Sequence, residues 1–163
     1  MSRWQFAFIG ALVLGLAVSA GAQEKAKYVK IVQVATGKVL AIENDSDDAE
    51  AKAVTAKDEA NPARQWKLEK DGAYYKIVNR KSGKVLDVNN QSKDEGGGII
   101  QWEDKTDDND NQRWQWKGEG EERRLVSKHS GLVLDTEVQG EVVQKKADEK
   151  AKNQLWRVVE IKE

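Results

Sequence analysis

The chain has 163 residues, one histidine, no cysteine and a formal net charge of −1, with 34% charged side chains. Because binding to a phosphate backbone needs a basic patch, this mixed and nearly neutral charge argues against nucleic acid as a partner. The absence of cysteine excludes disulfides and, with a single histidine, zinc sites of the usual ligand types. We therefore expect one domain with an apolar core, no cofactor and no metal.

The first 22 residues are typical of a secretory signal. Arg3 precedes an apolar run over residues 6–18, and Ala20-Gly21-Ala22 offers the small residues that a signal peptidase accepts. We predict a signal peptide over residues 1–22, cleavage before Gln23, and secretion to the extracellular space or the periplasm. A membrane anchor is the alternative, but the run is shorter than the ~20 residues that a spanning helix needs. We therefore expect no membrane span after cleavage.

The rest of the chain repeats one pattern three times, over residues of about 27–71, 72–120 and 121–163. Each copy has a glycine turn followed by an apolar run, and each ends on a tryptophan. The turn glycines are Gly37, Gly83 and Gly131. The closing tryptophans, which we expect in the core, are Trp66, Trp114 and Trp156. The glycine turn, the apolar run and the closing tryptophan recur in the same order in all three copies, which indicates a threefold architecture.

Each repeat is expected to contain four short strands, because β-branched residues in short runs between Gly, Asn and Asp favour strands. In the middle repeat the expected strands lie near Tyr75–Asn79, Val85–Val88, Ile99–Trp102 and Trp114–Lys117. Such a set in three copies predicts an all-β barrel with a hairpin cap. Two segments, 47–60 and 144–153, are rich in helix-forming Ala, Lys and Glu. Their place in the repeat favours a third strand and a loop instead.

The motifs Gly-Lys-Val-Leu-Asp, Gly-Gly-Ile-Ile-Gln-Trp and Asn-Gln-Arg-Trp of the middle repeat resemble the ricin-B-type lectin repeat, the Q-x-W β-trefoil. The resemblance covers about residues 27–163. It implies a β-trefoil of three pseudo-symmetric four-stranded repeats that binds galactose-, N-acetylgalactosamine- or xylose-type sugars, at most one per repeat. The chain departs from the family pattern at the cysteine before the Leu-Asp pair, where valine stands at Val39, Val85 and Val133.

The resemblance places a sugar site in the middle repeat. Asp87 would accept a sugar hydroxyl, Trp102 would stack on the apolar face of the ring, and Asn111 would donate to a ring hydroxyl. Gln112 would hold the acid and the amide in place. An aromatic face with a few convergent polar groups suits a pyranose. The alternatives are that Asp87 caps a turn, that Trp102 belongs to the core, and that Gln112 serves the fold alone.

The other two repeats have lost parts of this set. The third repeat keeps its polar members, which are Asp135, Asn153 and Gln154. It has Lys145 where Trp102 stands, so we expect at most a weak second sugar site there. The first repeat has Ala41 for the acid and Ala63 for the amide, and only small residues near Ala56 for the ring. We expect no site in that repeat.

We predict a secreted, monomeric lectin that binds glycans or polysaccharides through its middle repeat and has no enzymatic activity. His129 lies near Ser130 and Asp135 in the sequence, but a nucleophile motif of the G-x-S-x-G type is missing. One shallow site implies a monosaccharide dissociation constant on the order of millimolar. The alternative is a β-trefoil that has lost sugar binding and serves as a protein-interaction or inhibitor domain.

Overall fold

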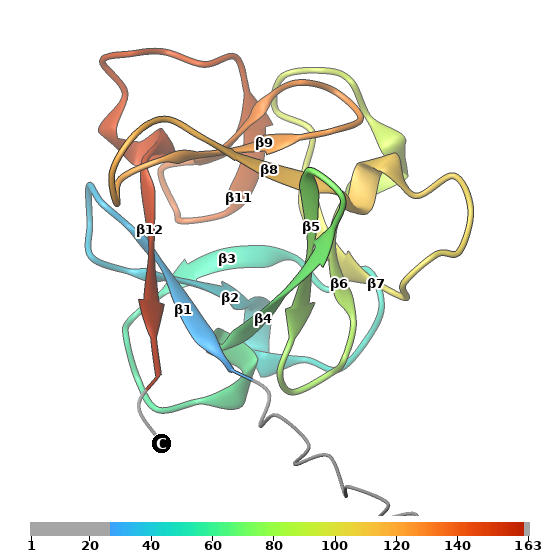
Figure 1. The fold of residues 1–163 in the computed structure, drawn as a ribbon. Coiled ribbons are helices and arrows are strands. Elements are labelled where there is room, and N and C mark those ends of the chain that lie inside the picture. The colour runs from blue at the N-terminus through green and yellow to red at the C-terminus, as the bar shows by residue number, and fades with distance from the viewer. Residues whose placement is uncertain (1–26, 162–163) are drawn as a thin grey trace, which may run out of the picture.

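A computed structural model describes residues 27–161, which form twelve β-strands (Figure 1). The first four strands are β1 (Val29–Gln33), β2 (Val39–Ile42), β3 (Ala53–Ala56) and β4 (Trp66–Asp71). The next four are β5 (Tyr74–Asn79), β6 (Val85–Val88), β7 (Ile99–Trp102) and β8 (Trp114–Lys117). The last four are β9 (Arg124–Ser127), β10 (Val133–Thr136), β11 (Val142–Lys145) and β12 (Trp156–Glu160).

The helical structure of the described residues consists of five short 3-10 turns. Three precede a closing tryptophan, namely η2 (Pro62–Arg64), η4 (Asp110–Gln112) and η5 (Lys152–Gln154). Two follow the second strand of a repeat, namely η1 (Glu43–Asp45) and η3 (Asn89–Gln91). The helix-forming composition of segment 47–60 is overridden, since β3 lies inside it. Within residues 27–161, we found no helix with the length and apolar character needed to span a membrane.

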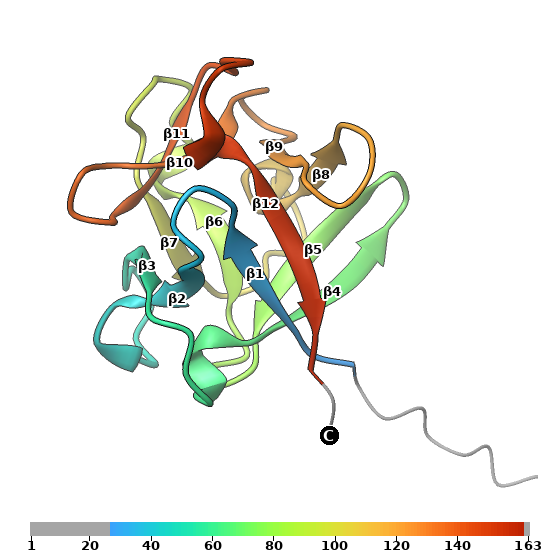
Figure 2. The ribbon, with the colours of Figure 1, turned by 90° about the vertical axis from the view of Figure 1, so that its left-hand side faces the viewer.

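Six strands form a closed barrel, which Figure 1 views along its axis. Ladders join β1 to β12 and to β4, β4 to β5, β5 to β8, and β8 to β9. Arg123 and Trp156 close the ring by exchanging two backbone hydrogen bonds of 2.9 Å. Because every barrel strand has two neighbours, the barrel has no open sheet edge. Figure 2 shows β1 and β12 side by side on one wall.

The remaining strands form three hairpins, β2–β3, β6–β7 and β10–β11, that cap the barrel. Single bridges link the hairpins to one another, at Lys52 with Ile100, Gly98 with Val143, and Val54 with Glu141. The hairpins share one register: Val39 faces Ala56, Val85 faces Trp102, and Val133 faces Lys145. A barrel with three equivalent hairpins is a β-trefoil, which confirms the predicted all-β fold.

The three closing tryptophans are fully buried and fill the centre of the fold, as predicted. Their indole N–H groups donate to leucine carbonyls of the hairpins, with distances of 2.9 Å for Trp66 to Leu40, 3.0 Å for Trp114 to Leu86, and 3.2 Å for Trp156 to Leu134. Each buried indole therefore has its polar group satisfied while its large apolar surface packs in the core. These contacts also fix each hairpin on the barrel.

The turn glycines are required by the backbone. Gly37, Gly83 and Gly131 have φ values of 69°, 71° and 73°, a region that glycine adopts without steric cost. The N–H group of each donates back to the end of the preceding strand, at Gln33, Asn79 or Ser127, over 2.9 to 3.0 Å. The glycines thus set where each hairpin begins, and with it the position of the acid at the end of the following apolar run.

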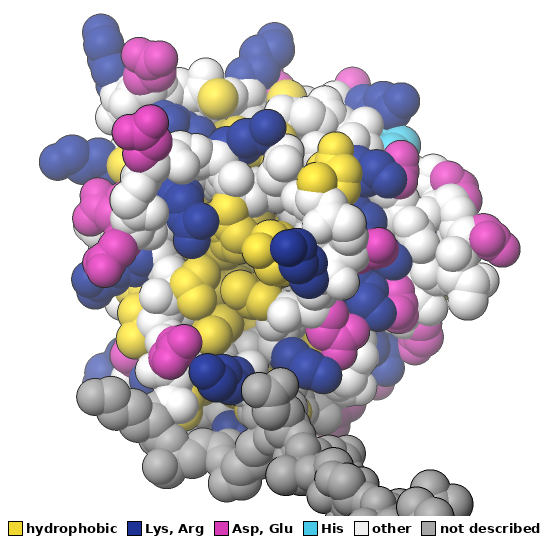
Figure 3. Space-filling model, in the orientation of Figure 1, with side chains coloured by type: hydrophobic (Ala, Val, Ile, Leu, Met, Phe, Trp, Pro, Cys, Tyr) yellow, Lys and Arg dark blue, Asp and Glu magenta, His cyan; other side chains and the backbone are white. Residues whose placement is uncertain are grey.

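The barrel end that faces the viewer in Figure 3 carries a group of apolar side chains at its centre, with Lys, Arg, Asp and Glu around it. Partly buried apolar residues pack against the core from β4, β8 and β12, namely Leu68, Trp116 and Val158. Each lies two residues after a closing tryptophan. The threefold repeat therefore extends from the cap through the tryptophan layer to these three positions.

Candidate functional site

A pocket of about 350 Å³ opens beside the β6–β7 hairpin of the middle repeat. Its residues come from the loop before β3, from β6 and η3, from β7 and the loop that follows it, and from η4. They are Glu50, Asp87, Asn89, Asn90, Gln91, Ile100, Trp102, Lys105 and Asn111. The structure therefore brings three of the four predicted site residues, Asp87, Trp102 and Asn111, into one pocket.

Asp87 is held by two amides. It lies on β6 with 3% of its surface exposed, and its carboxylate accepts hydrogen bonds of 2.8 Å from Asn111 Nδ2 and from Gln112 Nε2. Gln112 is fully buried and does not line the pocket; it also donates to the Glu103 carbonyl at 2.8 Å. Gln112 thus orients the acid from behind, whereas Asp87 faces the pocket.

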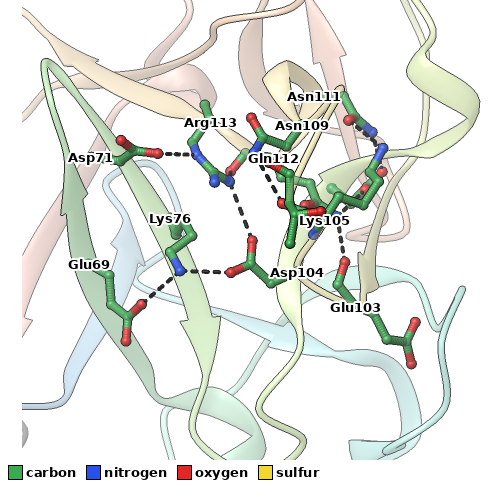
Figure 4. Close-up of polar contacts among 12 residues, drawn as sticks. Glu69, Asp71, Lys76, Glu103, Asp104, Lys105, Asn109, Asn111, Gln112 and Arg113 are labelled. Carbon is green, nitrogen blue, oxygen red and sulfur yellow. Dashed lines mark hydrogen bonds and ion pairs between the residues drawn. The ribbon is translucent and has the colours of Figure 1, made fainter.

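Asn111 makes more hydrogen bonds within the protein than the sequence analysis predicts. Its Nδ2 group donates to Asp87 and also to the Val88 carbonyl at 3.0 Å, which uses both amide hydrogens. Its oxygen accepts a hydrogen bond of 2.8 Å from Lys105 Nζ (Figure 4). In this arrangement Asn111 offers a ligand its oxygen and not the predicted donor. Lys105, which the sequence analysis missed, supplies the cationic donor of the pocket.

Burial raises the pKa of Asp87 from 3.8 to about 6. The hydrogen bond from Gln112, the positive charge of Lys105 and the hydrogen bond from Asn111 act in the opposite direction and limit this rise. The carboxyl is therefore ionised at neutral pH, where it accepts hydrogen bonds, and becomes protonated in mildly acidic solution.

Trp102 ends β7 and is half-buried, with its side chain on the pocket wall beside Ile100. It is therefore not a core residue like Trp114. The loop after it is fixed by ion pairs: Asp104 lies 2.7 Å from Lys76 Nζ and 3.6 Å from Arg113 Nη1 (Figure 4). These contacts tie the loop after β7 to β5 and to the residue before β8.

The third repeat has the same polar arrangement without the ring. Asp135 is 2% exposed and accepts hydrogen bonds from Asn153 and, at 2.8 Å, from Gln154. Lys145 faces Val133 as Trp102 faces Val85, and its Nζ lies 3.0 Å from Glu137. The position of the stacking ring is thus taken by an ion-paired lysine.

The first repeat has a smaller pocket, of about 110 Å³, lined by Glu43, Lys52, Val54, Gln139 and Glu141. It occupies the pseudo-threefold counterpart of the middle-repeat pocket, because Val54 faces Ala41 as Ile100 faces Asp87. Lys52 Nζ and Glu141 form an ion pair of 3.0 Å there. The acid, the ring and the amide of the middle repeat are all absent from this pocket.

His129 and Ser130 do not come together as a catalytic pair. A ring nitrogen of His129 lies 2.7 Å from the Gln91 carbonyl oxygen, while the Ser130 hydroxyl donates to Gln144 at 2.7 Å. Both side chains thus stabilise loops. Within residues 27–161, we found no group of three or more His, Cys, Asp or Glu side chains arranged to hold a metal ion.

Comparison with solved structures finds the same fold in several proteins. A designed threefold-symmetric protein, ThreeFoil, shares 35% identity with a TM-score of 0.77, over 82% of this chain and 99% of its own. An exo-β-1,3-galactanase from Clostridium thermocellum shares 33% identity with a TM-score of 0.76, over 85% of this chain but only 31% of its own. A Polyporus squamosus lectin shares 18% identity with a TM-score of 0.72, over 83% of this chain and 49% of its own, and shows the fold alone. No curated protein matches the sequence significantly.

The ricin-type β-trefoil lectin domain-like family model matches residues 2–102 and 110–163. The closed barrel, its three hairpins and this match define the class: the chain belongs to the ricin-type β-trefoil lectin-like family. Membership supports a carbohydrate-binding role.

Proposed function

We propose that the protein binds a galactose-, N-acetylgalactosamine- or xylose-type sugar through the pocket of its middle repeat, without chemical change to the sugar. The observation that supports this most is the convergence of an aromatic ring, Trp102, with a buried carboxylate, Asp87, in a pocket of about 350 Å³. A pyranose has an apolar face for the ring, and its hydroxyl groups donate to a carboxylate and accept from Lys105.

The size and polarity of the pocket agree with one monosaccharide unit. Ile100 and Trp102 supply apolar surface, whereas Asp87, Lys105 and Asn111 supply an acceptor, a donor and a second acceptor. A single open pocket on a monomer gives a dissociation constant on the order of millimolar for a monosaccharide. Repeated sugars on a polysaccharide would raise the effective affinity if the lectin is itself clustered.

A glycan array with three proteins tests the proposal. Wild type should bind galactose-, N-acetylgalactosamine- or xylose-terminated glycans, and Trp102→Ala should lose that signal, because the apolar face of the sugar then has no partner. Lys145→Ala changes the equivalent position of the third repeat and should bind like wild type. If wild type binds no glycan, or if Trp102→Ala binds as well as wild type, this function is rejected and a protein-binding role becomes the better hypothesis.

Export is part of the proposal. The predicted signal peptide, residues 1–22, lies outside the described residues, and its support is the sequence pattern alone. N-terminal sequencing of protein recovered from the culture medium or the periplasm tests it. The mature chain should begin at Gln23; recovery of the full-length chain from the cytosol alone would reject export.

A further inference from the structure

The pocket of the middle repeat contains one residue from another repeat. Glu50 lies in the loop before β3, within the first repeat, yet it lines the pocket with Asp87 and Trp102. Two backbone hydrogen bonds join this loop to β7: Glu50 N–H donates to the Gln101 carbonyl at 2.9 Å, and Gln101 N–H donates to the Ala51 carbonyl at 3.0 Å. These two hydrogen bonds fix the backbone of Glu50 beside Gln101, the residue that precedes Trp102 in β7.

The Gln101 side chain holds the same loop from its other end. Its Nε2 group donates to the Ser46 carbonyl at 3.0 Å and to the Asp48 carbonyl at 2.7 Å, and Gln101 is fully buried. The loop is therefore attached to the second repeat by four hydrogen bonds. The backbone of Glu50 therefore has a defined position, and its exposed side chain lines the pocket from there.

The pseudo-threefold axis provides two counterparts of Glu50. Gly96 donates its N–H to the Gln144 carbonyl at 2.8 Å, as Glu50 does to Gln101. The Gly140 carbonyl accepts a hydrogen bond from Thr55 N–H, just as the Ala51 carbonyl accepts one from Gln101 N–H. Gly140 is therefore the counterpart of Ala51, and Gln139 is the counterpart of Glu50. The counterparts are thus a glycine and an amide. Among these three equivalent positions, the carboxylate is that of Glu50, and Glu50 lines the same pocket as Trp102.

The backbone of Glu50 has an unfavourable conformation. Its φ is 65°, in the left-handed region, whereas its counterpart Gly96 has a φ of 82°. Glycine adopts this region freely, but a side chain with a β-carbon does so at an energetic cost. Within residues 27–161, no hydrogen bond or ion pair engages the Glu50 carboxylate. No side-chain hydrogen bond or ion pair inside the described residues therefore offsets that cost, and strained backbone of this kind clusters at functional sites.

We propose that Glu50 is a specificity-determining residue of the sugar pocket, which accepts a hydrogen bond from a sugar hydroxyl and selects neutral sugars over anionic ones. The inference rests on the proposed sugar-binding function. A carboxylate only accepts hydrogen bonds, so it favours a rim of hydroxyl groups. It repels a second carboxylate, and Asp87 adds to that repulsion, whereas Lys105 is the single cation of the pocket lining.

Titration calorimetry with galactose and galacturonic acid tests the proposal, since the two sugars differ by a carboxylate at one carbon. Wild type should prefer galactose by about fivefold or more. Glu50→Gly should weaken galactose binding about tenfold, the effect of losing one hydrogen bond to a charged acceptor. Glu50→Gln keeps the size of the side chain and should reduce the preference for galactose over galacturonic acid. Gln139→Gly, at the equivalent position of the first-repeat pocket, should change neither value.

Thermal unfolding of the same variants provides a readout independent of the ligand. Glu50→Gly should raise the melting temperature by a few degrees, because it relieves the left-handed backbone conformation, and should weaken binding at the same time. If wild type binds galactose and both Glu50 variants bind both sugars with unchanged affinity, this inference is overturned while the proposed function stands. If wild type binds no sugar at all, both are overturned.

Discussion

The pockets of the first and middle repeats share one hairpin register and differ in their contents. In both, a two-stranded hairpin presents its second strand to a loop of a neighbouring repeat, which is the third repeat for the first pocket and the first repeat for the middle one. Ala56 and Trp102 occupy equivalent register positions. The pocket volumes are about 110 Å³ and about 350 Å³. The smaller pocket holds an ion pair between Lys52 and Glu141, whereas the larger one presents a ring and a carboxylate. The fold supplies the position, and a few side chains decide whether a site forms there.

The third repeat lies between these two cases. It keeps a buried acid with two amides, Asp135 with Asn153 and Gln154, but has no ring and no carboxylate at the position of Glu50. The acid–amide network therefore has a structural role that does not depend on the pocket of the middle repeat. The comparison separates the network, which two repeats share, from Trp102 and Glu50, which the middle-repeat pocket alone contains.

The largest effect is expected from removing the acid of the middle repeat. Asp87→Ala should abolish measurable sugar binding and lower the free energy of unfolding by about 2 kcal/mol, because two buried amides lose their acceptor. Titration with galactose and urea denaturation measure the two effects. Asp135→Ala is the matched control: it should cost similar stability and keep full binding. Equal loss of binding in both variants would contradict the assignment of the site to the middle repeat.

A smaller effect is expected from pH, because the pKa of Asp87 is about 6 in the folded protein and 3.8 in the reference state. The folded state binds more protons in this interval, so the Asp87 contribution to stability decreases as pH rises from about 4 to about 6, by at most about 3 kcal/mol. Sugar affinity should instead rise with pH, because the ionised carboxylate is the better acceptor. Below about pH 6 the affinity should fall by up to about tenfold for each unit that the pH decreases.

Asp87→Asn is the baseline for this pH experiment. Urea denaturation of wild type and variant between pH 4 and pH 7 gives the difference in unfolding free energy, in which the other titrating groups largely cancel. Wild type should lose stability relative to Asp87→Asn as pH rises to about 6, and the difference should then stay constant. A difference that does not change with pH would show that Asp87 titrates in its ordinary range.

The smallest effect is expected from adding the ring to the third repeat. Lys145→Trp restores the stacking surface beside Asp135 and should add a second, weaker site, which raises the galactose stoichiometry from one to two. Breaking the ion pair of Lys145 with Glu137 should cost little, because the pair lies near the surface. If the stoichiometry stays at one, Gly96→Glu in the same variant should supply the missing carboxylate. If the double variant also binds only one galactose, Trp102 and Glu50 are not the residues that distinguish the middle-repeat pocket from its counterparts.

Much of the fold follows from the sequence, because its local signals repeat. The glycine turn at Gly83, the apolar run after it and the closing Trp114 each have a direct structural cause, and the three copies reinforce one another. Of the four strands expected in the middle repeat, three match the structure at both ends, and β5 begins one residue earlier. The place of β3 in the repeated hairpin, where it pairs with β2 over four residues, overrides the helix propensity of segment 47–60.

The candidate site follows from the sequence only where its residues belong to the repeat. Asp87, Trp102 and Asn111 are predicted from the resemblance of the middle repeat to the lectin motif, whereas Glu50 reaches the pocket from the preceding repeat through backbone contacts. Its loop is acidic and reads as a solvated surface. One signal was available: Glu50 aligns with Gly96, and a glutamate at a left-handed position that glycine fills in another copy indicates a functional cause.

The pairing of β1 with β12 has a consequence for how the chain folds. Val29 to Gln33 pair with Glu160 to Trp156, so the earliest barrel strand is completed by the last one to be synthesised. Until then β1 has one unpaired edge, and the first repeat cannot finish its share of the barrel. Contacts between such distant segments are slow to form, since a long loop must be closed first. We therefore expect the pocket of the middle repeat, although it lies between the first two repeats, to become fully rigid only when the third repeat has folded.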